Sequence, residues 1–312
     1  MPFFQPENRV VRDFIYDHPN IAGAICYHNT GGMLLHGPGN IYDTLTYGPR
    51  DLKLYRKIGQ MGEKLLPGYR VLLTYKELYS THGAESDWLH GARGILCWTG
   101  ELFTPYLMFH EKTQDFFGRQ EQTLEFDRYL LFEEAWRPWK EVTHPQYGAV
   151  LVGGMSKYFS RATPGFLLTE EHHRNMAFAL YHAHELPRLA IDSIGIKPRG
   201  DNLYELTLTV RNDGLTPTHL EHDLNHHIEA PDYFTIQGRN ATDVVAGMRV
   251  IDPLQNLTDW PQDNRYARLA VPNIAGRSKV SVRWWLRPGT YELEIRSQKG
   301  GTLRQRVRVP SS

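Results

Sequence analysis

The hydrophobic pattern divides the chain into two parts of different texture. In the first part, residues 5–17 carry apolar positions at helical spacing, as do residues 51–66, which end at Pro67-Gly68. IAGAICYH (21–28) and GILCWTGEL (94–102) are short, continuously apolar runs, which are typical of strands covered on both faces of an α/β sheet. The pattern therefore predicts a mixed sheet flanked by helices.

The stretch before Pro187 continues this alternation. Residues 123–141 predict a helix broken at Pro138, and AVLVGGM (149–155) predicts a strand. Residues 167–187 predict a helix that is entered through Thr169 and left at Pro187. We place a domain boundary there, so the first domain spans residues 1–186.

Beyond Pro187 the pattern changes to short period-two runs. They are separated by Asn-Asp-Gly (212–214), Arg-Pro-Gly (287–289) and Lys-Gly-Gly (299–301). Such runs and turns predict an antiparallel, all-β sandwich over residues 187–312. No repeat or low-complexity linker intervenes, which favours two domains packed directly together.

Composition narrows the classes of function. The chain has 35 basic and 35 acidic residues and a net charge of zero, so nothing in it indicates a nucleic-acid partner. No run approaches the roughly 20 apolar residues that span a membrane, and the first residues do not predict a secretory signal. Cys26 and Cys97 lie in apolar runs and are interpreted as buried free thiols.

The candidate chemistry lies in two segments. His28 ends an apolar run just before a glycine turn. Glu101 lies fourteen positions after Asp87, which is followed by Trp88. Tyr79 stands eight residues before Asp87. With this spacing the chain resembles the zinc metallocarboxypeptidases of the carboxypeptidase A type, in their C-terminal part, and the β region resembles the immunoglobulin-like modules that often follow bacterial members.

The resemblance implies a role for each matching residue. His28 corresponds to a zinc ligand, Glu101 to the general base that activates the zinc-bound water, and Tyr79 to the tyrosine that closes over the substrate. Ser86 would line the floor of the specificity pocket. A serine there argues against a preference for basic residues, although Glu85 beside it leaves that open. The implied reaction is hydrolysis of a peptide or amide bond near a free carboxylate, in a family that is often secreted or periplasmic.

The chain departs from the family upstream of His28. Zinc-dependent hydrolysis needs three protein ligands, a base and a cation for the oxyanion. The family's His-x-x-Glu ligands, oxyanion arginine and Asn-Arg pair all precede the strand that ends at His28, where this chain has only 27 residues. We therefore expect the chain alone to be weakly active or inactive.

Two alternatives remain open. The chain is either a non-catalytic peptide- or glycan-binding protein on a degenerate peptidase fold, or it pairs with itself or with a separate N-terminal half. Missing leading strands would leave an unpaired sheet edge and an uncovered apolar face, both of which favour association.

The other clusters of histidines are predicted to be structural and not metal ligands. HLEHDLNHHIE (219–229) contains His226-x-x-Glu229, and His222 lies four residues before His226, on one helix face. This segment lies in the β region, and we predict a solvated helix or loop. His182 and His184 are predicted to lie in a solvent-facing helix end.

Overall fold

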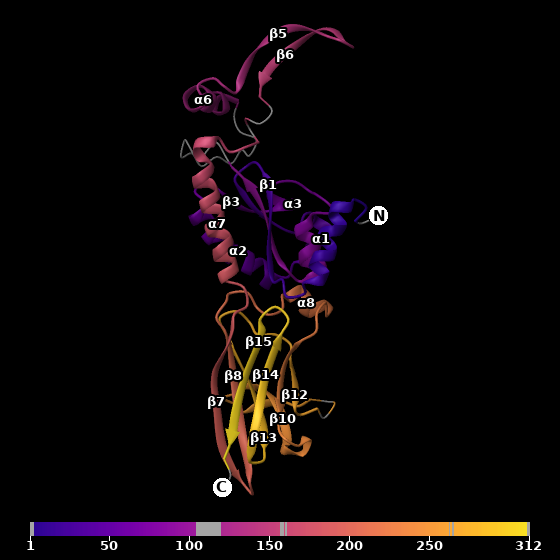
Figure 1. Cartoon of the computed structure of the whole chain (residues 1–312), viewed down its shortest axis with the longest axis vertical. Coiled ribbons are helices and arrows are strands. Elements are labelled where there is room, and N and C mark those ends of the chain that lie inside the picture. The colour runs from indigo at the N-terminus through magenta and orange to yellow at the C-terminus, as the bar shows by residue number, and fades with distance from the viewer. Residues whose placement is uncertain are drawn as a thin grey trace.

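The computed structural model describes residues 3–103, 120–156, 159, 161–261, 263 and 265–310, and of these only the backbone for residues 120–123 and 241. Three parts follow one another along the long axis of the molecule (Figure 1). An arm made of one helix and a β-hairpin lies at one end, a mixed α/β part in the middle, and a β part at the other end.

The α/β part is built on a four-stranded sheet of order β1-β4-β2-β3. The strands are β1 (Gly23–Asn29), β2 (Met33–His36), β3 (Arg70–Leu73) and β4 (Leu96–Leu102). β1 is parallel to β4 and β2 is parallel to β3, whereas β2 and β4 are antiparallel. The sheet is therefore mixed, as predicted.

Helices cover both faces of this sheet. α2 (Pro49–Leu65) and α7 (Leu168–His184) pack on the face that carries Leu34 and Trp98. α1 (Pro6–Asp17) and α4 (Glu85–Arg93) pack on the other face, against Cys97. Successive β4 residues thus enter opposite cores, which is why the run from 94 to 102 is continuously apolar.

β1 is the edge strand of the sheet and is only partly buried, but its side chains contact both cores, Ile25 on one face and Ala24 and Cys26 on the other, as predicted for a covered strand. Asp87 and Trp88 lie on helix α4. That helix ends at Gly94, whose φ of 56° is the left-handed conformation that favours glycine at a helix C-terminus.

The arm consists of helix α6 (Gln120–Leu130) and the β-hairpin of β5 (Trp136–His144) and β6 (Gly148–Met155). The predicted helix over 123–141 is therefore wrong beyond residue 130. Pro138 lies where the β5–β6 register is irregular, between Arg137 and Lys140, a position that does not need its missing N–H. Asp127 fixes the start of β5 by accepting hydrogen bonds from the backbone N–H of Ala135 (2.8 Å) and Trp136 (3.0 Å).

α7 also begins differently from the prediction. The helix starts at Leu168 after a short 3-10 turn, Gly165–Leu167, so Thr169 lies inside the helix and does not cap it.

The C-terminal part consists of two antiparallel sheets of orders β11-β10-β13-β8-β7 and β12-β9-β14-β15, which agrees with the predicted sandwich. Its strands are β7 (Leu189–Gly200), β8 (Leu203–Asn212), β9 (Asp232–Gln237), β10 (Val244–Asp252), β11 (Leu257–Asp259), β12 (Arg268–Val271), β13 (Lys279–Leu286), β14 (Gly289–Ser297) and β15 (Gly301–Val309). Alternate residues of both sheets, among them Trp284 and Phe234, form the core between them.

The α/β part and the C-terminal part are joined where two helices, one from each part, cap each other's N-terminus. Asp51, in the first turn of α2, accepts hydrogen bonds from the backbone N–H of Glu221 (2.8 Å) and His222 (3.1 Å), at the start of α8 (Glu221–His226). In return, the Glu221 carboxylate accepts from the backbone N–H of Arg50 (2.8 Å). Each carboxylate satisfies N–H groups that would otherwise lack partners at the other helix's N-terminus.

Candidate functional site

His28 and Glu101 lie side by side at the carboxyl ends of two parallel strands. They are register partners on β1 and β4, and His28 Nδ1 lies 3.4 Å from Glu101 Oε1. The His28 side chain is 59% exposed, whereas that of Glu101 is 11% exposed. The fold therefore brings the two residues predicted as metal ligand and base together, at the sheet edge where α/β proteins usually bind ligands.

The turn after β1 orients the Glu101 carboxylate. The backbone N–H of Thr30 donates to Glu101 Oε2 (3.1 Å), which leaves Oε1 on the side of His28. Gly31 donates to the carbonyl of Phe103 (2.8 Å) at a φ of 134°, which glycine adopts without strain. A carboxylate held in this way can accept a proton from a water molecule or from the imidazole beside it.

A buried network fixes the end of β4 just beyond Glu101. Glu171 of α7 accepts hydrogen bonds from the backbone N–H of Phe103 (3.0 Å), from the Asn175 amide (3.2 Å) and from the Tyr69 hydroxyl. Burial and the neighbouring Glu171 raise the pKa of Tyr69. Sequence analysis missed this network, because its members lie up to 106 residues apart and share no motif.

Tyr79 and Ser86 are attached at the other end of the sheet. Met33 of β2 pairs with Glu101, whereas β3 leaves the sheet beside His36, at the opposite end of β2. Tyr79 lies shortly after the end of β3, and its backbone N–H donates to the Thr74 carbonyl (3.1 Å). In the described part of the chain no hydrogen bond or ion pair joins Tyr79 or Ser86 to His28 or Glu101. Their substrate-binding roles stay predictions.

Asp87 has a structural role on α4. Its carboxylate accepts from the backbone N–H of Gly39 (3.0 Å) and from the Tyr47 hydroxyl (2.9 Å). Burial raises the pKa of Asp87, while these hydrogen bonds oppose the rise. Asp87 thus ties the segment after β2 to α4, and the buried Ser86 beside it lies in the first turn of the helix.

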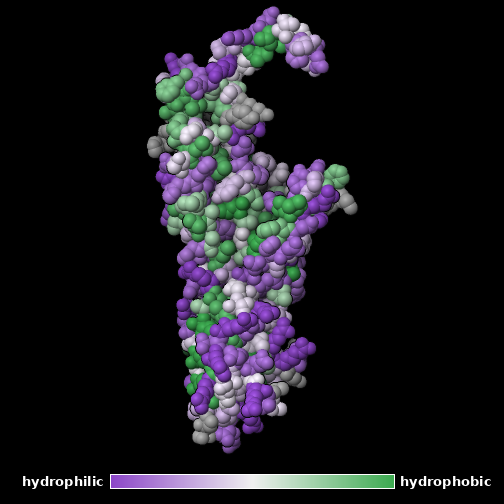
Figure 2. Space-filling model, in the orientation of Figure 1, coloured by the Kyte–Doolittle hydropathy of each residue, from purple (hydrophilic) through white to green (hydrophobic). Residues whose placement is uncertain are grey.

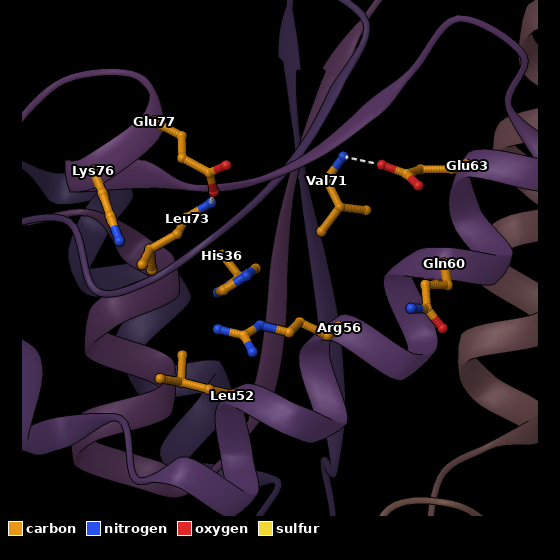
Figure 3. Close-up of a pocket in the computed structure, with 9 residues that line it drawn as sticks. All are labelled: His36, Leu52, Arg56, Gln60, Glu63, Val71, Leu73, Lys76 and Glu77. Carbon is orange, nitrogen blue, oxygen red and sulfur yellow. Dashed lines mark hydrogen bonds between the residues drawn. The ribbon is translucent and has the colours of Figure 1, made fainter.

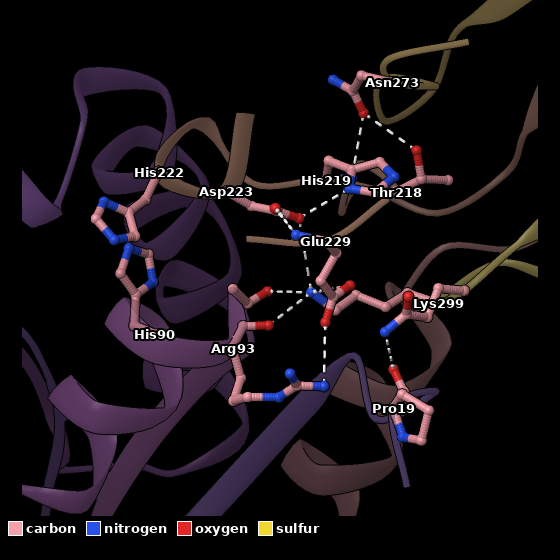
Figure 4. A network of polar contacts seen from close by, with 12 residues as sticks. Pro19, His90, Arg93, Thr218, His219, His222, Asp223, Glu229, Asn273 and Lys299 are labelled. Carbon is pink, nitrogen blue, oxygen red and sulfur yellow. Dashed lines mark hydrogen bonds and ion pairs between the residues drawn. The ribbon is translucent and has the colours of Figure 1, made fainter. Parts of the chain in front are cut away.

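One group of potential metal ligands lies at the junction with the sandwich. His219, Asp223 and Glu229 offer ligand atoms within 4.8 Å of one another. Lys299, in the β14–β15 turn, lies among them, with its Nζ 3.2 Å from Glu229 and 4.0 Å from Asp223 (Figure 4). Among the residues that the structure describes, no such group of three includes His28.

Charge and protonation fit an ion-pair network better than a cation site. Burial alone would lower the pKa of His219, but the hydrogen bond to Asp223 and the nearby carboxylate of Asp232, 3.4 Å from Nε2, outweigh it and raise the pKa to about 9. The three acids of the network are thus balanced by protonated His219, Lys299 and Arg93, whose guanidinium lies 3.5 Å from Glu229. A divalent ion would have to displace the ammonium group already there.

The prediction of a solvated segment at 219–229 is wrong for its key residues. His219 and Asp223 are buried, and His222 bonds the carbonyl of Gly91 (3.0 Å) on α4. The prediction for the end of α7 is half right, since His184 is exposed but His182 is buried. The first error arises because His222 and Asp223 pack against the first domain, at Gly91 and near Gly94. The second arises because His182 is buried within the first domain itself, against Gly23 of β1 and Phe178.

The two cysteines are neighbours in the core beside the site. Cys26 and Cys97 are free thiols whose Sγ atoms lie 3.6 Å apart. The hydrogen bond with Cys26 and burial raise the pKa of Cys97. Cys97 is buried as predicted, whereas Cys26 on the edge strand is only partly so.

Comparison with known proteins gives little beyond this geometry. Residues 188–308 match the family "Domain of unknown function (DUF8731)", which covers the sandwich. No curated protein matches the chain. In the described residues, no helix is long and apolar enough to cross a membrane.

Solved structures give low similarity. The apo PCuAC domain from PmoF1 has 10% identity and a TM-score of 0.24, and the match covers 41% of this chain and 97% of that domain. A GH20 exo-β-N-acetylglucosaminidase from Vibrio harveyi has 11% identity and a TM-score of 0.19, and covers 40% of this chain and 18% of the enzyme. Similarity at this level supports no conclusion about function.

Proposed function

We propose that residues 1–186 are the C-terminal part of a zinc metallocarboxypeptidase-like domain that hydrolyses a peptide or amide bond near a free carboxylate. One observation carries the proposal. His28 and Glu101 are register partners at the carboxyl ends of β1 and β4, with Nδ1 and Oε1 3.4 Å apart. A ligand and a general base must act on the same water, so such a pair has to be adjacent.

In this proposal His28 and Glu101 each have a stated task. His28 would be one zinc ligand, and Glu101 would take the proton of the attacking water at Oε1, since Thr30 already occupies Oε2. Tyr79 and Ser86 lie toward the other end of β2, so their predicted substrate contacts take no part in this step. Bound zinc would supply the Lewis acid. The exposure of His28 leaves its imidazole accessible from solvent.

A complete site would need further ligands from a polypeptide that adds to β1. β1 has a neighbour on one side only among the described strands. The helix α1 beside it exposes Val10, Val11 and Phe14. Apolar side chains over this region are visible in Figure 2. An open strand edge next to an exposed apolar helix face is what a further part of an α/β sheet would cover.

The second candidate is a non-catalytic protein that binds peptide or glycan on the same scaffold. It is favoured by the observation that, in the part of the chain that the structure describes, no group of three metal ligands includes His28. Zinc binding at His28 distinguishes the two candidates.

Zinc titration followed through the histidine ring signals in NMR spectra tests the first candidate. We expect zinc to perturb His28 with a dissociation constant on the order of 1 mM, because one imidazole beside a carboxylate gives only about 4 kcal/mol. Glu101→Gln should weaken this binding several-fold, and His28→Ala should remove it. His184→Ala, at another exposed histidine, should leave it unchanged.

The opposite result is equally clear. If zinc shifts other exposed histidines and leaves the His28 ring unaffected up to several millimolar, His28 is not a ligand. The non-catalytic candidate would then stand.

The exposed face of α1 leads to a prediction about association. We expect the chain to form at least dimers at tens of micromolar, measured by light scattering, because a second copy would cover this face and the β1 edge. Phe14→Glu should shift the mass toward the 36.1 kDa monomer. Tyr147→Glu, which replaces an exposed aromatic at the hairpin tip, serves as the control. A monomeric parent chain would refute this prediction.

A further inference from the structure

A hollow lies on the α2 face of the sheet, away from His28 and Glu101. It has a volume of about 350 Å³ and is formed by α2, the ends of β2 and β3, and α3 (Thr74–Glu77) (Figure 3). Leu52, Val71 and Leu73 give it apolar walls. This size and this mixture of walls are within the range of small-molecule sites.

The acidic side chains around this hollow are engaged with backbone groups. Glu77 accepts a hydrogen bond from the N–H of Leu73 (2.7 Å), and Glu63 accepts one from the N–H of Val71 (2.9 Å). Both carboxylates therefore serve to fix β3 and keep their negative charge.

The basic side chains are not engaged in this way. Arg56 and Lys76 line the same hollow, and among the described residues neither has a carboxylate within the 4.0 Å of an ion pair. In Figure 3 the Arg56 guanidinium extends along the hollow beneath His36, and the Lys76 ammonium is directed toward the same space. Two cations thus lie at this hollow without an ion-pair partner, beside two carboxylates that are bound to backbone N–H groups.

The third polar group, His36, is held rigidly. Its Nδ1 donates to the carbonyl of Gly37 (2.8 Å), and its ring stacks on Tyr55 with centroids 4.9 Å apart. Burial lowers the pKa of His36 to about 4, so at neutral pH the ring is uncharged and adds no charge to the hollow. Its ring signals can therefore report on what binds beside it.

We propose that this hollow binds a small organic anion, whose carboxylate or phosphate group contacts Arg56 and Lys76 and whose apolar part lies on Leu52, Val71 and Leu73. Arginine and lysine together are well suited to such groups, because the guanidinium binds two oxygens at once. The site lies at the His36 end of β2, whereas Glu101 pairs with Met33 at the other end. It is therefore independent of the proposed hydrolytic role.

The basic surface of α2 supports this assignment. Arg50, Lys53 and Lys57 of the same helix line a neighbouring hollow of about 410 Å³ at the junction with the sandwich. Asp51 and Glu221 line that hollow as well, and Glu221 pairs with Arg50, so Lys53 and Lys57 are the cations that add to the positive potential along α2.

The test is a titration of the whole chain with succinate and with inorganic phosphate, at constant ionic strength, followed by calorimetry and by the His36 ring signal. Saturable binding with a dissociation constant on the order of 1 mM or tighter, with a shift at His36, is expected for at least one of them. Comparison of the two shows whether the group recognised is a carboxylate or a phosphate.

Each variant removes one positive charge: Arg56 and Lys57 are neighbours on α2, and Lys76 lies on α3. Arg56→Gln should weaken binding about tenfold, and Lys76→Gln several-fold. Lys57→Gln, which does not line this hollow, should change it less than twofold. Absence of saturable binding of either anion, or an equal loss in Lys57→Gln and Arg56→Gln, would overturn the proposal.

Discussion

Replacing Lys299 with methionine is expected to lower the free energy of unfolding by about 3–5 kcal/mol, the largest effect of any single substitution considered for this chain. The Lys299 ammonium is buried 3.2 Å from Glu229 and also donates to the backbone carbonyls of Arg93 (2.9 Å) and Gly94 (2.7 Å). Those carbonyls end α4, where a cation also opposes the negative end of the helix dipole. Methionine keeps the apolar stem but leaves the carboxylate of Glu229 with Arg93 alone.

Calorimetry and urea unfolding measure this effect. Because Lys299 lies in the β14–β15 turn and its partners Arg93 and Gly94 end α4, the substitution should also separate the unfolding of the two parts. A single transition in the parent chain would then become two. Lys279→Met is the control, since Lys279 forms an exposed ion pair with Asp192 (2.8 Å) and should cost at most about 1 kcal/mol. Equal losses in the two variants would contradict this account.

Two of the four strands of the sheet, β1 and β4, follow directly from the sequence. Their runs, which end at His28 and Leu102, are apolar because both strands carry side chains into two cores, and their β-branched and aromatic residues favour extended backbone. The order β1-β4-β2-β3 does not follow, because it depends on β2 turning back beside β4. The adjacency of His28 and Glu101 was accordingly available only from the family resemblance.

The junction between the domains was the hardest feature to predict. His219 and Asp223 share a helical spacing, but Lys299 and Arg93 lie 76 residues after and 130 residues before Asp223. Sequence spacing alone cannot bring these groups together, so a histidine-rich, acidic segment had the appearance of a solvated surface. His182 is a different case, because it is buried within the first domain, against Gly23 of β1.

His182 provides a second strong prediction, one that depends on pH. It is buried on α7, and its Nε2 has no hydrogen-bond partner among the described residues. Burial lowers the pKa of His182 from 6.5 to about 4. A group whose pKa is lower in the folded state stabilises the fold fully above its unfolded pKa, and that contribution is lost as the pH falls from about 6.5 through 4.

The substitution His182→Leu removes this titration and the unpaired nitrogen. Above pH 6.5, the difference in free energy of unfolding between the variant and the parent chain should not change with pH. Below pH 6.5, the free energy of unfolding of the variant should rise relative to the parent by about 1.4 kcal/mol for each pH unit, reaching about 3 kcal/mol near pH 4. Urea unfolding at a series of pH values measures the difference directly.

His184→Leu is the matched control, because this residue lies two positions further along the same helix with an exposed side chain. Because this side chain is exposed, its removal should not reproduce the gain of His182→Leu below pH 6.5. If the two variants had parallel pH profiles, protonation of His182 would not oppose folding, and water would have to reach its ring in the folded state. The predicted divergence instead requires that the contact between α7 and Gly23 of β1, where a Cβ atom would lie 2.9 Å from the imidazole, stays closed to solvent.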